Sequence, residues 1–130
     1  MTTPRLDAIG IVARDLDAAI RFYRLLGLAF PDRAEGEDHL EATTPGGLRV
    51  MLDSEALARS LDPAWVAPVG HRMGMAFHCG DAAGVDAAYA RVLGEGFAGV
   101  AAPWDAFWGQ RYARVSDPDG NVVDLFAPLG

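Results

Sequence analysis

Lysine is absent from this sequence of 130 residues, and cysteine occurs once, at Cys79. A single cysteine excludes an internal disulfide framework and indicates a reducing compartment. Positive charge is also scarce, because the 11 arginines face 18 acidic residues and leave a formal net charge of −7. Nucleic-acid binding requires clustered positive charge, so we expect no nucleic-acid partner.

Long apolar runs are missing too. No stretch reaches the roughly 18 apolar residues that a membrane-spanning helix needs, so we expect no membrane association. The opening residues, MTTPRLDAIG, lack a basic region followed by an apolar stretch. We therefore expect no signal peptide and a cytoplasmic location. The hydrophobic content of 51% is enough to give a single domain, residues 1–130, a core of its own.

Two stretches of the sequence repeat one pattern, in which an apolar strand, an aspartate, a helical periodicity and a glycine follow one another. The two stretches are IGIVARDLDAAIRFYRLLGL (9–28) and MAFHCGDAAGVDAAYARVLGEGF (75–97). Asp15 and Asp81 are good helix N-caps, and we expect Gly27 and Gly94 at the C′ positions where the helices end. Each stretch therefore predicts a strand followed by a helix.

A predicted hairpin follows each of these helices. Within 39–52, the strand-like pieces HLEAT and LRVML flank PGG. Within 111–126, RYARVS and VVDLF flank DPDGN in the same way. The stretch 117–120 suits a type I turn and lacks the further oxygen ligands that a calcium loop needs. We interpret it as a turn.

These elements make the chain a tandem duplication with an α+β fold. Two βαβββ modules are predicted at about 5–53 and 73–127, with a connector near 53–72. The periodicity of each helix supports burial of one helix face against its own sheet. The other faces of the sheets must then be covered or must enclose something. We therefore expect the modules to form a half-barrel pair around a cavity.

The helix sequence DLDAAIRFYRLLGL and the ending DPDGNVVDLFAP resemble the vicinal oxygen chelate superfamily, which includes glyoxalases, bleomycin resistance proteins and extradiol dioxygenases. The segments PWDAFWGQRYARVSDPDGNVVDLFAPL, SLDPAWVAP and GGLRVMLD are similar to the mitomycin-binding resistance proteins within that superfamily. The resemblance covers nearly the whole chain. It implies a fold whose enzymes hold a divalent metal with two histidines and two glutamates.

The resemblance aligns these four metal ligands with Ala8, Met51, Gly74 and Asp124. Of these residues, only the aspartate can bind a metal. A divalent ion needs at least about three suitable protein ligands, so we expect no metal and no cofactor. A displaced site of His78 and Asp124 with His39 or His71 is an alternative, although no H-x-H or H-x-x-x-H spacing supports it. Otherwise His78 is an isolated polar group in the cavity wall.

Four of the chain's 12 aromatic residues fall within nine positions, at Trp104, Phe107, Trp108 and Tyr112. The first three have the spacing of one helical face, which favours core packing. However, a proline and a glycine leave room for only one turn, and such a turn rarely buries two tryptophans. The resemblance implies that Trp108 stacks on a planar drug, with His39 as the opposite wall. We expect Phe107 in the core, while Trp104 and Tyr112 could be either core or ligand contacts.

The leading interpretation is a non-catalytic self-resistance protein that sequesters a planar, quinone-like or polycyclic antibiotic. Met51, Leu52, His78 and Asp124 are further predicted ligand contacts, and Arg111 is either solvent-facing or a donor to a ligand carbonyl. The alternatives are a metal-dependent enzyme of the same superfamily and a metal-free enzyme that uses Asp124 as acid or base. Because each module leaves a poorly covered sheet face, we also expect a homodimer.

Overall fold

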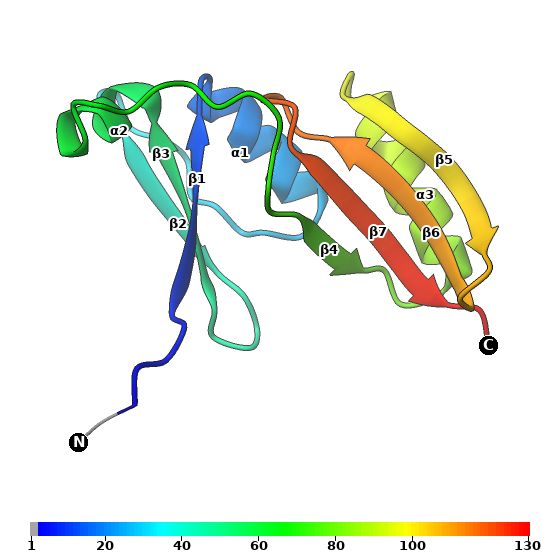
Figure 1. Ribbon diagram of the computed structural model, residues 1–130. Helices are drawn as coiled ribbons and strands as arrows, with labels where there is room; N and C mark the ends of the chain where they lie inside the picture. Colours follow the sequence, from blue (N-terminus) through cyan, green and yellow to red (C-terminus); the bar gives the residue numbers. More distant parts are fainter. Residues whose placement is uncertain (1–2) are drawn as a thin grey trace. The chain divides into compact units, whose positions relative to one another are not determined.

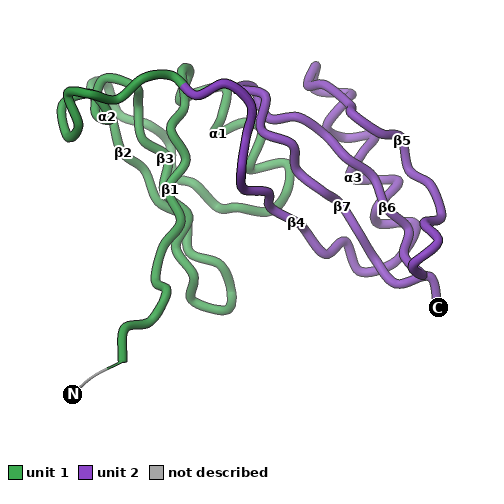
Figure 2. Tube along the Cα trace, in the orientation of Figure 1, with its two compact units in different colours: residues 1–67 green, residues 68–130 purple. Residues whose placement is uncertain are grey.

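The computed structural model describes residues 3–130 and contains seven strands and three helices (Figure 1). The chain divides into two compact units, residues 1–67 and residues 68–130 (Figure 2). One predicted module falls in each unit. No helix among the described residues is long and apolar enough to cross a membrane.

Unit 1 is a three-stranded sheet with helices. Its elements are β1 (Ala8–Ala13), α1 (Leu16–Leu25), β2 (His39–Thr43), β3 (Arg49–Ser54) and α2 (Glu55–Leu61). The strand order is β1-β3-β2. Strand β1 runs parallel to the central strand β3, and β2 runs antiparallel to it, as the predicted hairpin requires. The first and last strands of the unit therefore lie side by side.

The core of unit 1 lies where α1 packs on β3. The Asp15 side chain caps α1 by accepting a hydrogen bond from the Ala18 backbone at 3.1 Å. The apolar spacing of the helix turns one face inward, and Phe22 and Tyr23 are fully buried there. Alternate strand residues, including Leu40 and Val50, meet that face. The opposite face of the sheet carries the other side chains of the same strands.

Unit 2 has a four-stranded sheet and one helix. Its elements are β4 (Met75–His78), α3 (Ala82–Gly94), β5 (Ala98–Ala106), β6 (Gln110–Ser116) and β7 (Val122–Pro128). The strand order is β4-β7-β6-β5, with β4 parallel to β7 and the other pairs antiparallel. Helix α3 packs on β5, β6 and β7. It therefore covers only one face of this sheet.

The predicted α+β fold of repeated modules is confirmed, with three differences in detail. The stretch between α1 and β2 forms no strand, so unit 1 lacks a counterpart of β5. The predicted connector contains the helix α2, whose first turn the Ser54 side chain caps. The prediction for Gly94 is wrong, because it is the last residue of α3, and Gly96, with φ of 90°, occupies the C′ position instead. Three residues, Glu95, Gly96 and Phe97, lie between the end of α3 and the start of β5.

The predicted turn at 117–120 is present and well tied. The buried Asp117 side chain accepts hydrogen bonds from the backbones of Asp119 and Asn121 at 2.9 and 2.8 Å and from the Asn121 amide at 2.8 Å. Both of its carboxylate oxygens therefore accept hydrogen bonds from within the turn. This supports the interpretation of the segment as a structural turn.

Candidate functional site

The face of the unit 2 sheet that α3 leaves uncovered carries most of the predicted site residues. Val115, Val123 and Leu125 are buried on the helix side. Since side chains alternate across a strand, their neighbours leave from the other face. The strand register then places side by side on that face these residues: Ala76 with Asp124 and Arg114, and His78 with Phe126, Tyr112 and Trp104.

Trp104, Trp108 and Tyr112 form a cluster in which every pair of rings meets edge to face. The ring centroids lie 6.2 Å apart for the two tryptophans, 5.5 Å for Trp104 and Tyr112, and 5.1 Å for Trp108 and Tyr112. The Trp108 indole N–H donates to Gln110 Oε1 at 2.8 Å, which fixes the ring further. The tryptophans stay 36% and 48% exposed, so this aromatic cluster presents ordered ring surface.

The local backbone differs from the helical turn that the spacing favoured. Trp104 lies on β5, and Trp108 lies in the short turn that joins β5 to β6. Gly109 closes this turn with a φ of 91° and a backbone hydrogen bond to Ala106. The prediction that Phe107 is in the core is wrong, because its side chain at the tip of the turn is 96% exposed. Its ring and that of Trp108 meet edge to face, with centroids 5.0 Å apart.

Asp124 is hydrogen-bonded to two neighbours on β6. One carboxylate oxygen accepts a hydrogen bond from the Tyr112 hydroxyl at 2.5 Å, and the other accepts from Arg114 Nε at 2.8 Å. Burial, with the adjacent carboxylate of Asp124, raises the pKa of Tyr112 to about 12. The phenol therefore keeps its proton at neutral pH and donates it to Asp124.

Arg111 lies on the other side of the sheet from these residues. It precedes Tyr112, so its side chain projects from the face of the sheet that α3 covers. Its guanidinium pairs with Asp86 of α3 at 2.9 Å and with Asp105 of β5 at 3.0 Å. The two ion pairs were not predicted, and the role of Arg111 as a donor to a ligand carbonyl stays a prediction. Arg111 joins the helix to the edge of the sheet.

His78 ends β4 on the same face as Asp124. Its Nδ1 accepts a hydrogen bond from the Gly80 backbone at 2.9 Å, and its ring meets Phe126 edge to face at 5.0 Å. The first contact lies within the turn after β4 and the second is with the neighbouring strand β7, as expected for a polar group in the wall of the sheet. Within residues 3–130, no group of three or more histidine, cysteine, aspartate or glutamate side chains is arranged to hold a metal ion.

The metal that the fold family implies does not fit the residues at its aligned positions. Ala8 and Gly74 have no side-chain donor atom, and the Met51 thioether is a weak ligand for the hard or borderline ions that carboxylates and imidazoles bind. Asp124, the one remaining donor, gives both of its oxygens to Tyr112 and Arg114. No three suitable ligands remain at these positions.

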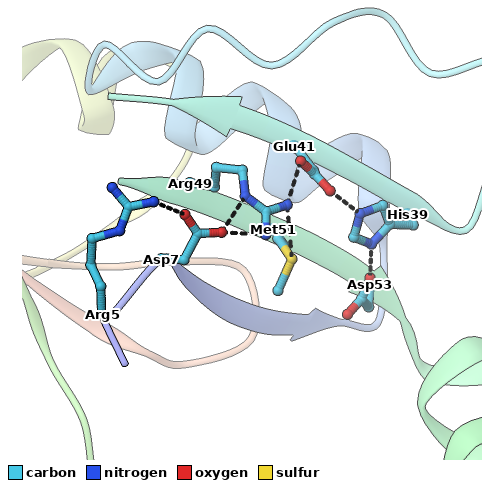
Figure 3. Close-up of polar contacts among 7 residues, drawn as sticks. All are labelled: Arg5, Asp7, His39, Glu41, Arg49, Met51 and Asp53. Atoms are coloured by element: carbon cyan, nitrogen blue, oxygen red, sulfur yellow. Dashed lines mark hydrogen bonds and ion pairs between the residues drawn. The ribbon is translucent and has the colours of Figure 1, made fainter. Parts of the chain in front are cut away.

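The corresponding face of unit 1 carries a row of alternating charges (Figure 3). The row, called the charge ladder below, runs in this order: Arg5, Asp7, Arg49, Glu41, His39 and Asp53. The Arg49 guanidinium joins Asp7 and Glu41, each at 2.8 Å. Met51 lies beside this arginine, with its sulfur 4.0 Å from Nη1. The charged groups of the ladder are therefore paired mainly with one another.

His39 lies between Glu41 and Asp53 in the charge ladder, with a carboxylate on each ring nitrogen. Its Nε2 is 2.7 Å from Glu41, and its Nδ1 is 2.5 Å from Asp53. Hydrogen bonds to these two groups, that of Glu41 first, raise the pKa of His39 above its usual value. The edges of the ring are therefore occupied, and its faces are left for stacking. His39 belongs to unit 1 and Trp108 to unit 2, so the stacking of one ligand between them stays a prediction.

Sequence reasoning missed Glu41 and Asp53 as partners of His39, although the sequence contains a signal for them. Residues two apart on a strand share a face, and the predicted hairpin brings β2 against β3 with His39 opposite Asp53. The same alternation overturns the prediction for Leu52. Leu52 is fully buried among the core residues of unit 1, so it cannot contact a ligand on the opposite face.

Comparisons with known proteins agree with this architecture. The family described as the Glyoxalase/Bleomycin resistance protein/Dioxygenase superfamily matches residues 5–125. No curated protein matches the sequence. Among solved structures, a glyoxalase/bleomycin resistance protein/dioxygenase from Nocardioides is 26% identical, with a TM-score of 0.75 and coverage of 99% of this chain and 86% of that one.

Two further structures are alike in fold. A glyoxalase-related enzyme from Fulvimarina pelagi has a TM-score of 0.82 at 18% identity, over 96% of this chain and 88% of that chain. Lactoylglutathione lyase from Agrobacterium tumefaciens has a TM-score of 0.67 at 21% identity, over 98% and 96%. At such identities the likeness concerns the fold alone.

Proposed function

We propose a ligand-binding role for this chain, which belongs to the Glyoxalase/Bleomycin resistance protein/Dioxygenase superfamily. The chain binds and sequesters a planar, quinone-like or polycyclic antibiotic and does not convert it. The observation that carries this proposal is the aromatic cluster of Trp104, Trp108 and Tyr112, three rings held by one another and still partly exposed. The similarity of the surrounding segments to mitomycin-binding resistance proteins supports the same role.

The aromatic cluster offers enough contact for binding without chemistry. Covering about 300 Å² of apolar ligand surface contributes about 7 kcal/mol at ~25 cal/mol per Å². Each ring contact with favourable geometry adds ~0.5–1.5 kcal/mol. The loss of translational and rotational freedom removes at least about 4 kcal/mol of this total. Because the rings are already fixed by mutual contacts and by Gln110, little further ordering is needed, and micromolar affinity is within reach.

The state of Asp124 supports binding over catalysis. A general base accepts the substrate proton on an oxygen that the substrate can reach. Both oxygens of Asp124 are engaged, one by a phenol and one by a guanidinium. Asp124 therefore acts as a structural anchor for Tyr112 and Arg114.

The test is prolonged incubation of the purified protein with a panel of mitomycin-like and polycyclic quinone antibiotics. Bound compound is then released by denaturation and identified by mass. We expect recovery of unchanged compound and quenching of tryptophan fluorescence on binding. Replacing Trp108 by Ala should weaken binding by about 1–3 kcal/mol, the range for losing a central aromatic contact. Chemical conversion that disappears in the Asp124→Asn variant would show an enzyme instead.

Trp65 provides the matched control for this experiment. It is the third tryptophan of the chain and lies in unit 1, where the Arg59 guanidinium covers its ring at 5.0 Å from the centroid. Replacing Trp65 by Phe removes one indole from the fluorescence signal and leaves the aromatic cluster intact. Binding by this variant should equal that of the wild type. An equal loss of affinity in the Trp65 and Trp108 variants contradicts the proposal.

We also propose that the protein is a homodimer. Each unit has one sheet face without a helix, which a second copy of the chain could cover, and two-fold dimers are the commonest homo-oligomers. Sedimentation equilibrium at tens of micromolar should give about twice the chain mass of 13.8 kDa. A mass of one chain under those conditions contradicts this part of the proposal.

A further inference from the structure

The guanidinium of Arg114 lies beside the aromatic cluster with most of its donors unused. Arg114 follows Tyr112 by two residues on β6, so both side chains leave the same face of the sheet. Its Nε donates to Asp124 at 2.8 Å. Of the residues that the structure describes, no other accepts a hydrogen bond from this side chain. A guanidinium carries five N–H donors, so the four on the two Nη atoms remain for a ligand.

Asp124 fixes the direction of this guanidinium. Its other oxygen is held by the Tyr112 hydroxyl at 2.5 Å, so the carboxylate cannot turn freely. The side chain of Asp124 is 23% exposed and that of Arg114 is 41% exposed. The less exposed Asp124 carboxylate therefore fixes Nε of Arg114, and the two Nη atoms at the end of the guanidinium remain accessible. The charges of Arg114 and Asp124 cancel. A bound anion therefore meets no net local charge and interacts with the oriented N–H donors.

The spacing along β6 matches the size of a fused ring system. Two residues of a strand separate Tyr112 from Arg114 by about 7 Å. Trp104 lies opposite Tyr112 in the register of β5, and Ala101, a small residue, lies opposite Arg114. A flat ligand stacked on the rings at one end therefore reaches Arg114 with its edge. No bulky β5 side chain is paired with Arg114 in that register.

We propose that Arg114 determines specificity in this site by selecting planar ligands with two neighbouring oxygen atoms at one edge. A carboxylate and an adjacent hydroxyl–carbonyl pair both present such oxygens. The planar fork of an arginine donates two parallel hydrogen bonds to a pair of this kind, and it donates only one to a lone hydroxyl. The proposal rests on the proposed function and adds the chemistry of the ligand's edge, which the aromatic cluster alone does not specify.

The experiment measures binding of two probes to the full-length protein by calorimetry. The probes are anthracene-2-carboxylate and anthracene-2-methanol, which share one ring system and differ in the edge group. We expect the wild type to prefer the carboxylate by at least about tenfold, the size of a charge-assisted hydrogen bond. In Arg114→Met, which keeps the apolar stem, the preference should fall to within about twofold. In Arg114→Lys, which keeps the charge and loses the fork, it should be intermediate.

Retained binding of the alcohol probe shows that each Arg114 variant is folded. Trp108→Ala should weaken both probes alike, because it removes ring surface that both use. If the preference for the carboxylate survives in Arg114→Met while Trp108→Ala weakens both probes, this inference is overturned and the proposed function stands. If the wild type binds neither probe, or if Trp108→Ala changes neither affinity, the proposed function fails and this inference fails with it.

Discussion

Two glycines two residues apart at the end of α3 should respond oppositely to the same substitution. Gly94 is the last helical residue, and its φ is not positive. Gly96 has a φ of 90°, and its N–H donates to the Leu93 carbonyl at 3.0 Å. The next residue, Phe97, donates to the Val92 carbonyl at 3.2 Å. These two bonds are those of a Schellman motif with Gly96 at C′.

The expected magnitudes follow from the backbone of each glycine. A Cβ at Gly94 meets no atom within 4 Å. Replacing this helical glycine by Ala should therefore stabilise the protein by about 0.5–1 kcal/mol. A Cβ at Gly96 also has open space, but the left-handed backbone costs a residue with a Cβ about 1–2 kcal/mol. Gly96→Ala should therefore destabilise the protein, and the two variants should differ by roughly 2 kcal/mol.

Urea denaturation followed by circular dichroism measures both free energies of unfolding. The two variants have the same composition, so effects of the substitution on the unfolded chain largely cancel in the comparison. Comparable slopes of the unfolding transition confirm that the same surface is exposed in each case. A Gly94→Ala variant that is less stable than Gly96→Ala refutes the assignment of the C′ position and with it the observed end of α3.

Four other predictions concern the core and the two sheet faces. Replacing the fully buried Leu52 by Ala should cost about 2–5 kcal/mol in unfolding experiments, whereas the same change at the 76% exposed Leu61 should stay within about 0.5 kcal/mol. In Asp124→Asn, NMR titration of ¹³C-labelled tyrosine should show the pKa of Tyr112 falling part of the way from about 12, because burial, the larger cause, remains while the neighbouring negative charge is gone. The raised pKa of His39 means that its contribution to stability is complete below the unfolded value of about 6.5 and is lost as pH rises through the folded pKa, so His39→Gln should flatten the stability profile at and above neutral pH. Elemental analysis should find no stoichiometric zinc, nickel, manganese or iron in the purified protein, and one tightly held metal per chain would contradict the assignment of the aligned positions.

The local signals in the sequence identified most of the fold. Asp15 and Asp81 have the chemistry of N-caps, and both accept the expected backbone hydrogen bonds from residues Ala18 and Gly84. The turn sequences separate the strands of both hairpins correctly. These features depend on a few neighbouring residues, which is why local patterns are enough to predict them.

The residues of the candidate site are determined by the face of the strand that each occupies. Local sequence patterns alone predicted some of these positions wrongly. The spacing of Trp104, Phe107 and Trp108 fits one helical face, yet the same spacing also crosses the end of a strand and a turn, which leaves Phe107 exposed. Leu52 and Met51 are adjacent and therefore cannot both face the same side. Applying strand alternation to the predicted hairpin would have removed Leu52 from the site and added Asp53.

The parallel pairing of first and last strands affects the order in which the chain can fold as it is synthesised. In unit 2, β4 ends at His78 and its neighbour β7 begins at Val122, 44 positions later (122 − 78 = 44). At about 5–20 residues per second, a ribosome needs about 2–9 s to make that stretch. Unit 1 has its last strand complete at Ser54, before unit 2 begins at residue 68. Strand β4 therefore lacks its partner β7 for some seconds after all strands of unit 1 have been synthesised. Premature termination within that stretch yields a chain with every strand of unit 1 and an incomplete sheet in unit 2.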